Sequence, residues 1–76
     1  MRIDLDLNLK GNICPMNVIN AKAAIKKLES GQTMRVIIDD PTGYEDVPKA
    51  LKREGHKIIS LKKLNDKDFE IIVQKK

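Results

Sequence analysis

The stretch KGNICPMN, residues 10–17, contains the only cysteine of the chain, Cys14, followed directly by Pro15. The thiolate is the nucleophilic form of cysteine, and a helix N-terminus can lower the thiol pKa until much of it is ionised near neutral pH. Proline is favoured at the first helical position, where its missing N–H would have no partner. The pattern predicts Cys14 at a helix N-cap, its thiolate supported by Pro15, Met16 and Asn17. The alternative is a small buried hydrophobe, a common role for free cysteine.

A single thiol can carry out few reactions on its own. A dithiol redox pair needs a second cysteine, and a cysteine hydrolase needs a histidine base with an orienting group. The only histidine, His56, lies far along the chain, and Cys14 with His56 is too small a set for a metal site. We therefore expect no metal and no cofactor. The remaining chemistry is a thiol that receives a group and passes it on.

The composition indicates an ordinary soluble protein. The 76 residues are enough for one domain, residues 1–76, with 41% hydrophobic and 34% charged residues. No apolar run approaches the length of a membrane span, and the N-terminus alternates apolar and acidic residues, unlike a signal peptide. A lone cysteine favours a reducing compartment, so we expect a cytoplasmic protein. The net charge of +4 would suit acidic partners, but a solvated surface is the first explanation for it.

The hydrophobic pattern predicts six elements in the order β-α-β-α-β-β. Strands are expected over residues 3–9, 33–39, 56–64 and 69–75, the last two forming an antiparallel hairpin. One helix is expected from Pro15 to about Glu29, with a stripe made by Val18, Ala21, Ile25 and Leu28. A second is expected between Gly43 and Glu54, with Pro48 in its first turn because proline is destabilising further inside.

This order predicts an α/β two-layer sandwich. Each helix connects two strands, so both helices are expected to cover one face of a four-stranded mixed sheet. The first strand supports this arrangement, because its polar alternate positions leave only one apolar face to bury. Cys14 would then lie at the end of the helix layer, at the surface.

Three segments, LKGNICP, IIDDP and DVPKALKREGH, resemble the TusA/SirA-like sulfur-carrier proteins. That family opens its first helix with Cys-Pro-x-Pro after an Asp-Leu-x-Gly stretch, and the likeness runs from about residue 3 to 75. The resemblance implies the two-layer sandwich reached above. It also implies that Cys14 accepts sulfane sulfur as a persulfide from a cysteine desulfurase or a rhodanese. The sulfur would pass to an acceptor protein, as in tRNA thiolation, so the chain would be a relay protein rather than a turnover enzyme.

The resemblance also suggests roles for charged residues around the thiol. Lys22 and Lys26, together with Lys10, would belong to a basic surface that meets partner proteins. Asp39 and Asp46 would help docking, or serve only as a loop acid and an acid at the start of the second helix.

Two residues depart from the family pattern: Asn8 replaces an aspartate, and Asn17 replaces the second proline of Cys-Pro-x-Pro. Unlike proline, Asn17 has a backbone N–H, and the third helical residue can donate to an N-cap side chain. We therefore expect the Asn17 N–H to donate to the Cys14 thiolate.

Two other functions remain open on the sequence alone. A small basic α/β module could bind RNA or DNA, but the chain has only Tyr44 and Phe69 for stacking and no dense basic stripe, so direct nucleic-acid binding is not expected. A regulatory adaptor without sulfur chemistry is the other alternative, and it would tolerate loss of the thiol. No membrane contact is expected.

Overall fold

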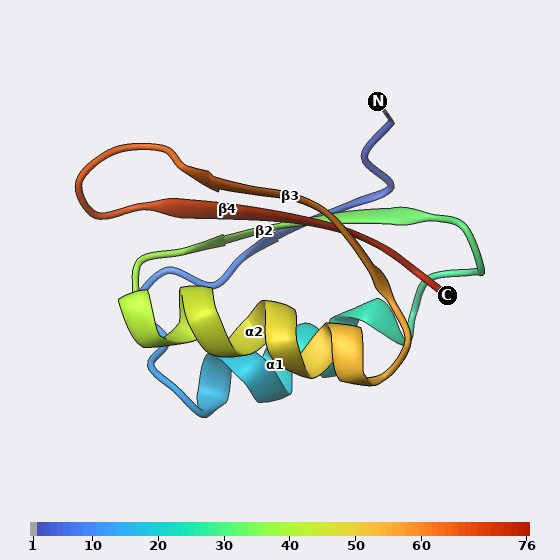
Figure 1. Ribbon diagram of the computed structural model, residues 1–76, viewed down its shortest axis with the longest axis horizontal. Helices are drawn as coiled ribbons and strands as arrows, with labels where there is room; N and C mark the ends of the chain where they lie inside the picture. Colours follow the sequence, from blue (N-terminus) through green and yellow to red (C-terminus); the bar gives the residue numbers. More distant parts are fainter. Residues whose placement is uncertain (1) are drawn as a thin grey trace.

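The computed structural model describes residues 2–76 and has six elements in the predicted order (Figure 1). The strands are β1 (Leu5–Asn8), β2 (Thr33–Ile38), β3 (Lys57–Lys63) and β4 (Phe69–Gln74). The helices are α1 (Met16–Ile25) and α2 (Pro41–Arg53). No helix within residues 2–76 is long and apolar enough to cross a membrane.

The four strands form one mixed sheet in the order β1-β2-β4-β3. β1 runs parallel to β2, whereas β4 is antiparallel to both β2 and β3, so the predicted β3–β4 hairpin is confirmed. The pairing of β3 with β4 shifts register between Ile58 and Ser60, which marks a β-bulge. Both helices lie on one face of this sheet, so the predicted two-layer sandwich is confirmed (Figure 1).

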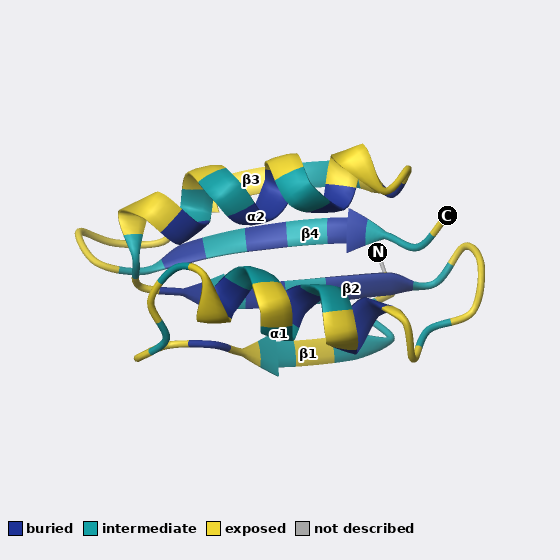
Figure 2. Cartoon of the chain, turned by 90° about the horizontal axis from the view of Figure 1, so that it is seen from below, coloured by how far each residue is buried: buried dark blue, intermediate teal, exposed yellow. Residues whose placement is uncertain are grey.

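The core lies between the helix layer and the sheet. α2 packs over β3 and β4, α1 packs over β2, and the two helices contact one another. The exposed residues of both helices lie on their outer sides (Figure 2). β2 and β4 contribute alternate buried residues, as expected of strands with one covered face. The fully buried apolar side chains include Ile25, Met34, Val36, Ile38, Val47, Leu51, Ile71 and Val73.

α2 begins earlier than predicted, at Pro41, and the expectation that Pro48 lies in its first turn is wrong. Asp40 is the N-cap: its side chain accepts from the N–H groups of Thr42 and Gly43, and Pro41 occupies the first turn. An aspartate cap followed by proline is a strong helix start. Pro48 lies well inside the helix and is buried, so its ring contributes to the core although its nitrogen donates no hydrogen bond.

α1 is shorter than predicted and begins one residue later. It spans Met16–Ile25, with Pro15 rather than Cys14 at the N-cap, and the peptide bond between Cys14 and Pro15 is cis. The chain after Ile25 continues as turns up to Gly31, whose φ of +88° is a conformation that glycine adopts readily. Cys14 therefore belongs to the loop that leads into α1 and not to the helix itself.

The two edges of the sheet differ in length and charge. β1 forms one edge and has only four residues. β3 forms the other edge and carries Lys57, Lys62 and Lys63, all exposed. Short strands and lysines are two of the ways in which natural sheets avoid pairing with further strands.

The two helices are in close contact where the buried Asn17 of α1 meets Gly43 of α2. A Cβ built on Gly43 would lie 2.7 Å from Asn17 Cγ and closer still to Nδ2. The Asn17 side chain is fully buried and its Nδ2 donates to Asp40, so it cannot move aside freely. Position 43 therefore has no room for a side chain.

We expect Gly43→Ala to lower the free energy of unfolding by about 1–3 kcal/mol through overpacking, measured by urea denaturation. In an Asn17→Ala background, the same change should be neutral or stabilising. The clash is then absent, and alanine exceeds glycine within a helix by roughly 0.5–1 kcal/mol. An equal loss of unfolding free energy in both backgrounds would show that the Asn17 side chain is not what excludes a side chain at position 43.

Candidate functional site

The Cys14 side chain bridges the loop before α1 and the side of α2. Its backbone N–H donates to Asp40 Oδ2 at 3.0 Å, and its Sγ donates to Asp46 Oδ2 at 3.3 Å. The residue is half-buried, so the sulfur is neither enclosed in the core nor fully open to water. Two carboxylates from α2 and its N-cap thus fix the position of the thiol.

The Asp40 carboxylate joins three segments of the chain. Its Oδ2 accepts from the Cys14 N–H at 3.0 Å, from Asn17 Nδ2 at 3.2 Å and from the Gly43 N–H at 3.3 Å. Its Oδ1 accepts from the Thr42 N–H at 3.3 Å. The sequence had offered no role for Asp40 in the site. An aspartate placed directly before proline and a helical pattern is the N-cap signal that could have revealed it.

These hydrogen bonds keep Asp40 charged. Burial acts to raise the pKa of the Asp40 carboxyl, but the donors from Cys14, Asn17, Thr42 and Gly43 together outweigh burial and hold the pKa below its usual value. The folded protein therefore favours the anionic carboxylate that the N-cap and the cysteine loop both need.

The same surroundings favour the protonated form of Cys14. The hydrogen bond to Asp46 is the largest cause, followed by burial and then by the negative charges of Asp46 and Asp40, and all of them raise the pKa of the thiol. The predicted lowering of the Cys14 pKa is thus wrong. The physical reason is that carboxylates, and not free helix N–H groups, surround the sulfur.

The first turn of α1 does not serve the sulfur in the way predicted. The N–H groups of Met16 and Asn17 both donate to the Ile13 carbonyl, at 2.7 and 3.3 Å. The expectation that the Asn17 N–H donates to the Cys14 thiolate is therefore wrong. Asn17 acts through its buried side chain, which donates to Asp40. Its Oδ1 is buried and has no hydrogen-bond partner among residues 2–76. Pro15 and Met16 are exposed and flank Cys14 in the chain.

The predicted charged residues are not gathered around the thiol. Lys10 pairs with Asp68 at 3.0 Å, and Lys22 pairs with Glu54 at 2.9 Å between the two helices. Lys26 is exposed just after α1. Asp39 Oδ1 accepts from the Gly11 N–H at 3.0 Å, which closes the cysteine loop. Among the predicted charged residues, only Asp46 contacts Cys14. Asp46 lies inside α2 and not at its start.

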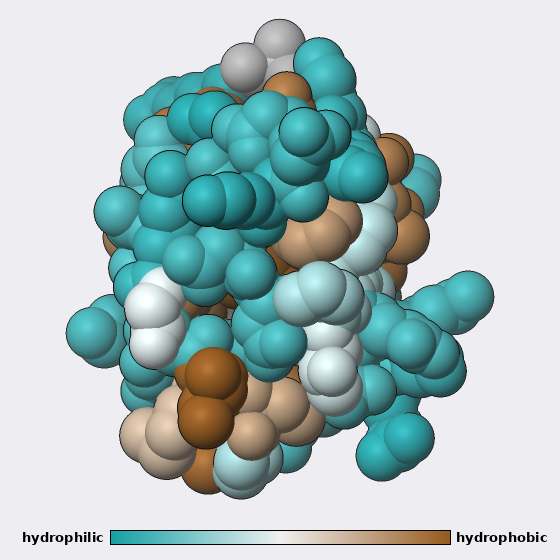
Figure 3. Space-filling view, turned by 90° about the vertical axis from the view of Figure 1, so that its left-hand side faces the viewer, coloured by the Kyte–Doolittle hydropathy of each residue, from teal (hydrophilic) through white to brown (hydrophobic). Residues whose placement is uncertain are grey.

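Exposed apolar side chains lie next to the thiol in the chain. Ile13 is 70% exposed, Met16 47% and Ile19 52%. Hydrophobic residues gather on the helix-layer side of the face shown in Figure 3, at the end of the molecule where α1 begins. We call Ile13, Met16 and Ile19 the apolar rim. The sequence analysis did not single out Ile13, which lies in the loop before α1, or Ile19, which lies off the buried stripe of the helix.

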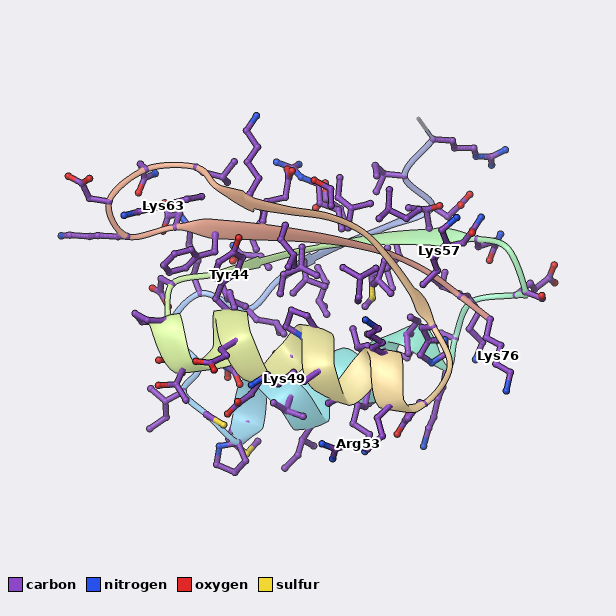
Figure 4. The ribbon with its side chains drawn as sticks, in the orientation of Figure 1. Tyr44, Lys49, Arg53, Lys57, Lys63 and Lys76 are labelled. Carbon is purple, nitrogen blue, oxygen red and sulfur yellow. The ribbon has the colours of Figure 1, made fainter. Side chains whose placement is uncertain are left out.

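A hollow of about 270 Å³ opens beside the thiol, between the start of α1 and one side of α2. We call it the Cys14 hollow; its walls are Cys14, Pro15, Val18, Asp46, Lys49, Ala50 and Arg53. Lys49 and Arg53 both belong to α2, and the Arg53 side chain points away from the sheet (Figure 4). The sequence analysis did not assign these two cations. Their spacing from Asp46 could have placed them on one face of α2.

The donor set offers no metal site in the part of the chain that is described. Residues 2–76 contain no group of three or more histidine, cysteine or acidic side chains arranged to hold an ion. His56 takes no part in the site: its Nδ1 accepts from the Lys76 N–H.

The protein is thus a small α/β sandwich with a single cysteine, which is half-buried and held by two carboxylates. Comparison with known proteins identifies the family of this chain. Residues 5–75 match the family model described as sulfurtransferase TusA. The chain belongs to the TusA family.

Individual relatives agree with this assignment. A protein of Archaeoglobus fulgidus, provisionally named a sulfur carrier protein, is 36% identical over 92% of this chain and 80% of its own length. The sulfur carrier protein TusA of Allochromatium vinosum is 29% identical over 95% of this chain and 93% of its own. The crystal structure of a SirA-like protein from Desulfitobacterium hafniense has the same fold. Its TM-score is 0.81, with 22% identity over 92% of this chain and 95% of that one.

Replacing Asp46 by alanine removes both the hydrogen-bond acceptor and its charge, so we expect the pKa of Cys14 to fall and its alkylation rate at neutral pH to rise. The pKa is read from the pH dependence of thiolate absorbance. Glu45→Gln is the matched control, because it removes a neighbouring exposed carboxylate that pairs with Lys49 and not with the sulfur. An unchanged pKa in Asp46→Ala would contradict the assignment of the hydrogen bond.

Asp40→Ala should lower the free energy of unfolding at neutral pH by about 0.5–2 kcal/mol for the N-cap alone. Because the folded pKa of Asp40 lies below the unfolded value, this contribution is fully present above the unfolded pKa. It is lost as the pH falls through the folded one. Denaturation at a series of acidic pH values should therefore show that the difference in free energy of unfolding between the native protein and the variant becomes smaller as the pH falls. A difference independent of pH would mean that the Asp40 charge does not contribute to stability.

Proposed function

We propose that this chain is a sulfur carrier in which Cys14 accepts sulfane sulfur as a persulfide and relays it to an acceptor protein. A cysteine desulfurase or a rhodanese is the proposed donor, tRNA thiolation is one proposed use, and the cytoplasm is the proposed compartment. The observation that supports this most directly is a half-buried thiol held at the end of the helix layer by Asp46, in a member of the TusA family. In this proposal the chain is a relay protein and not a turnover enzyme.

The proposed loading step is a thiol–persulfide exchange. The Cys14 sulfur attacks the outer sulfur of a donor cysteine persulfide, the donor's S–S bond breaks, and its electron pair leaves with the donor sulfur. The Cys14 proton is transferred and the donor becomes a thiol, so one thiol and one persulfide enter the step and one of each leaves it. Asp46 is the nearest acceptor for that proton. Since attack needs the thiolate, the carboxylate keeps the free thiol weakly nucleophilic until a donor is aligned.

The apolar rim is the proposed docking surface for donor and acceptor. Exposed apolar side chains beside a reactive group suit a contact that excludes water during the exchange. Lys26 makes no ion pair within residues 2–76 and adds charge attraction at the edge of the rim. Lys10 and Lys22, in contrast, already pair with Asp68 and Glu54. Transient contacts of this kind allow the same surface to meet two partners in turn.

The test is loading by a donor enzyme. After incubation with a cysteine desulfurase and cysteine, or with a rhodanese and thiosulfate, intact mass without reductant should show one added sulfur atom in the native protein. Cys14→Ser should show none, because it lacks the thiol. Ile13→Ser should slow loading while leaving alkylation of the thiol by a small reagent unchanged.

Failure of the native protein to gain sulfur from either donor would overturn the carrier proposal. A Cys14→Ser variant that replaces the native protein in a cellular assay would favour the adaptor alternative.

A further inference from the structure

The Cys14 hollow contains a charge arrangement that loading from a donor protein does not require. Asp46, Lys49, Ala50 and Arg53 follow one another at helical spacing along one side of α2, and this side faces the thiol, because Asp46 bonds to Cys14 Sγ. The hollow thus has the sulfur on one wall and two cations on the other. Its one carboxylate, Asp46, is bonded to the thiol.

The two cations are not equally free. Lys49 Nζ pairs with the exposed Glu45 at 3.1 Å, a neighbour on its own helix. Arg53 has no ion-pair or hydrogen-bond partner among residues 2–76, and it is exposed to solvent. A guanidinium offers a planar fork of donors that suits oxoanions bidentately. Arg53 therefore supplies the open anion-binding group of the hollow.

The small residue at position 50 creates the space. Ala50 lines the hollow of about 270 Å³ together with Cys14, Lys49 and Arg53, and its methyl group occupies less room than a longer side chain would. This volume matches the size of a small anion with its hydration water. The ligand that fits is small, anionic and able to approach a sulfur atom.

We propose that the Cys14 hollow binds a small sulfur oxoanion, with sulfite as the direct acceptor of the sulfur carried on Cys14. This step rests on the proposed function, because it needs the persulfide. The sulfite sulfur attacks the outer sulfur of the Cys14 persulfide, and a new S–S bond forms as the bond to Sγ breaks. The electron pair of the broken bond stays on Sγ, which takes up the proton of the persulfide's outer sulfur, or a proton from water when the persulfide is ionised. Cys14 returns to the thiol and thiosulfate leaves. No oxidant or reductant is consumed.

Arg53 and Lys49 would act on this step by attracting the dianion and by offsetting its repulsion from Asp46 and from an ionised persulfide. Because these charges are near the surface, the attraction should weaken as salt is added. A nucleophile without an oxoanion group should gain less from the attraction of Arg53 and Lys49. Cyanide, which removes persulfide sulfur as thiocyanate, is such a reference.

The experiment measures thiosulfate release when sulfite is added to persulfide-loaded protein, beside thiocyanate release with cyanide. We expect Arg53→Gln to lower the sulfite rate about tenfold, Lys49→Gln to lower it less, and both to change the cyanide rate by no more than about twofold. Ala50→Leu should also slow sulfite by filling the hollow without changing a charge. Lys52→Gln is the matched control, since it removes a cation from the same helix outside the hollow.

Equal losses with both nucleophiles, or equal effects of Lys52→Gln and Arg53→Gln, would overturn the proposal. Binding is also tested without a persulfide, by following backbone amide signals of the unloaded protein during titration with sulfate, an unreactive oxoanion. Saturable shifts at Val18, Ala50 and Arg53 that vanish in Arg53→Gln are expected, and their absence would count against the site. If the donor enzymes fail to load Cys14 while sulfate still binds, the carrier proposal fails and the anion site stands.

Discussion

The arrangement of the site depends on the hydrogen bonds that the Asp40 carboxylate accepts. This carboxylate caps α2, accepts from the backbone of the cysteine loop and receives the buried side chain of Asn17, so it fixes the start of α2 relative to the start of α1. A single charged group can do this because four N–H donors compensate the cost of burying it. With α2 fixed in this way, Asp46 comes within hydrogen-bond distance of the sulfur.

The electrostatics of the thiol follow from that placement. The two carboxylates on the α2 side favour a neutral sulfur, and the N–H groups at the start of α1 are taken by the Ile13 carbonyl. A protonated thiol is a weaker nucleophile than the thiolate, so these surroundings lower the intrinsic reactivity of Cys14. The apolar rim beside the sulfur remains exposed to solvent.

The sheet and the helix layer could be predicted from the sequence because their signals are local and repeated. β1 alternates with period two, and β2 and β4 are rich in branched apolar residues between clear turn residues. The start of α2 was misplaced because Pro48 was given more weight than the Asp40-Pro41 pair. Burial of the Pro48 ring in the core offsets the backbone hydrogen bond that is missing there.

The candidate site was predicted only in part, since its contacts join residues far apart in the chain. Cys14 was singled out by its type and by the proline that follows. Its bonds to Asp40 and Asp46 cross 26 and 32 positions of the chain, and no local pattern reports such pairs. The pKa prediction had the wrong direction for the same reason, because it considered the helix that follows Cys14 and not the helix that faces it.

The two edges of the sheet have a consequence for how copies of the chain meet. A second β3 laid alongside the first would bring lysine against lysine, and the four residues of β1 offer little backbone to pair with. Ribbon-like growth through the sheet is therefore disfavoured even when the protein is abundant. The helix layer, where the sulfur lies, takes no part in such strand pairing.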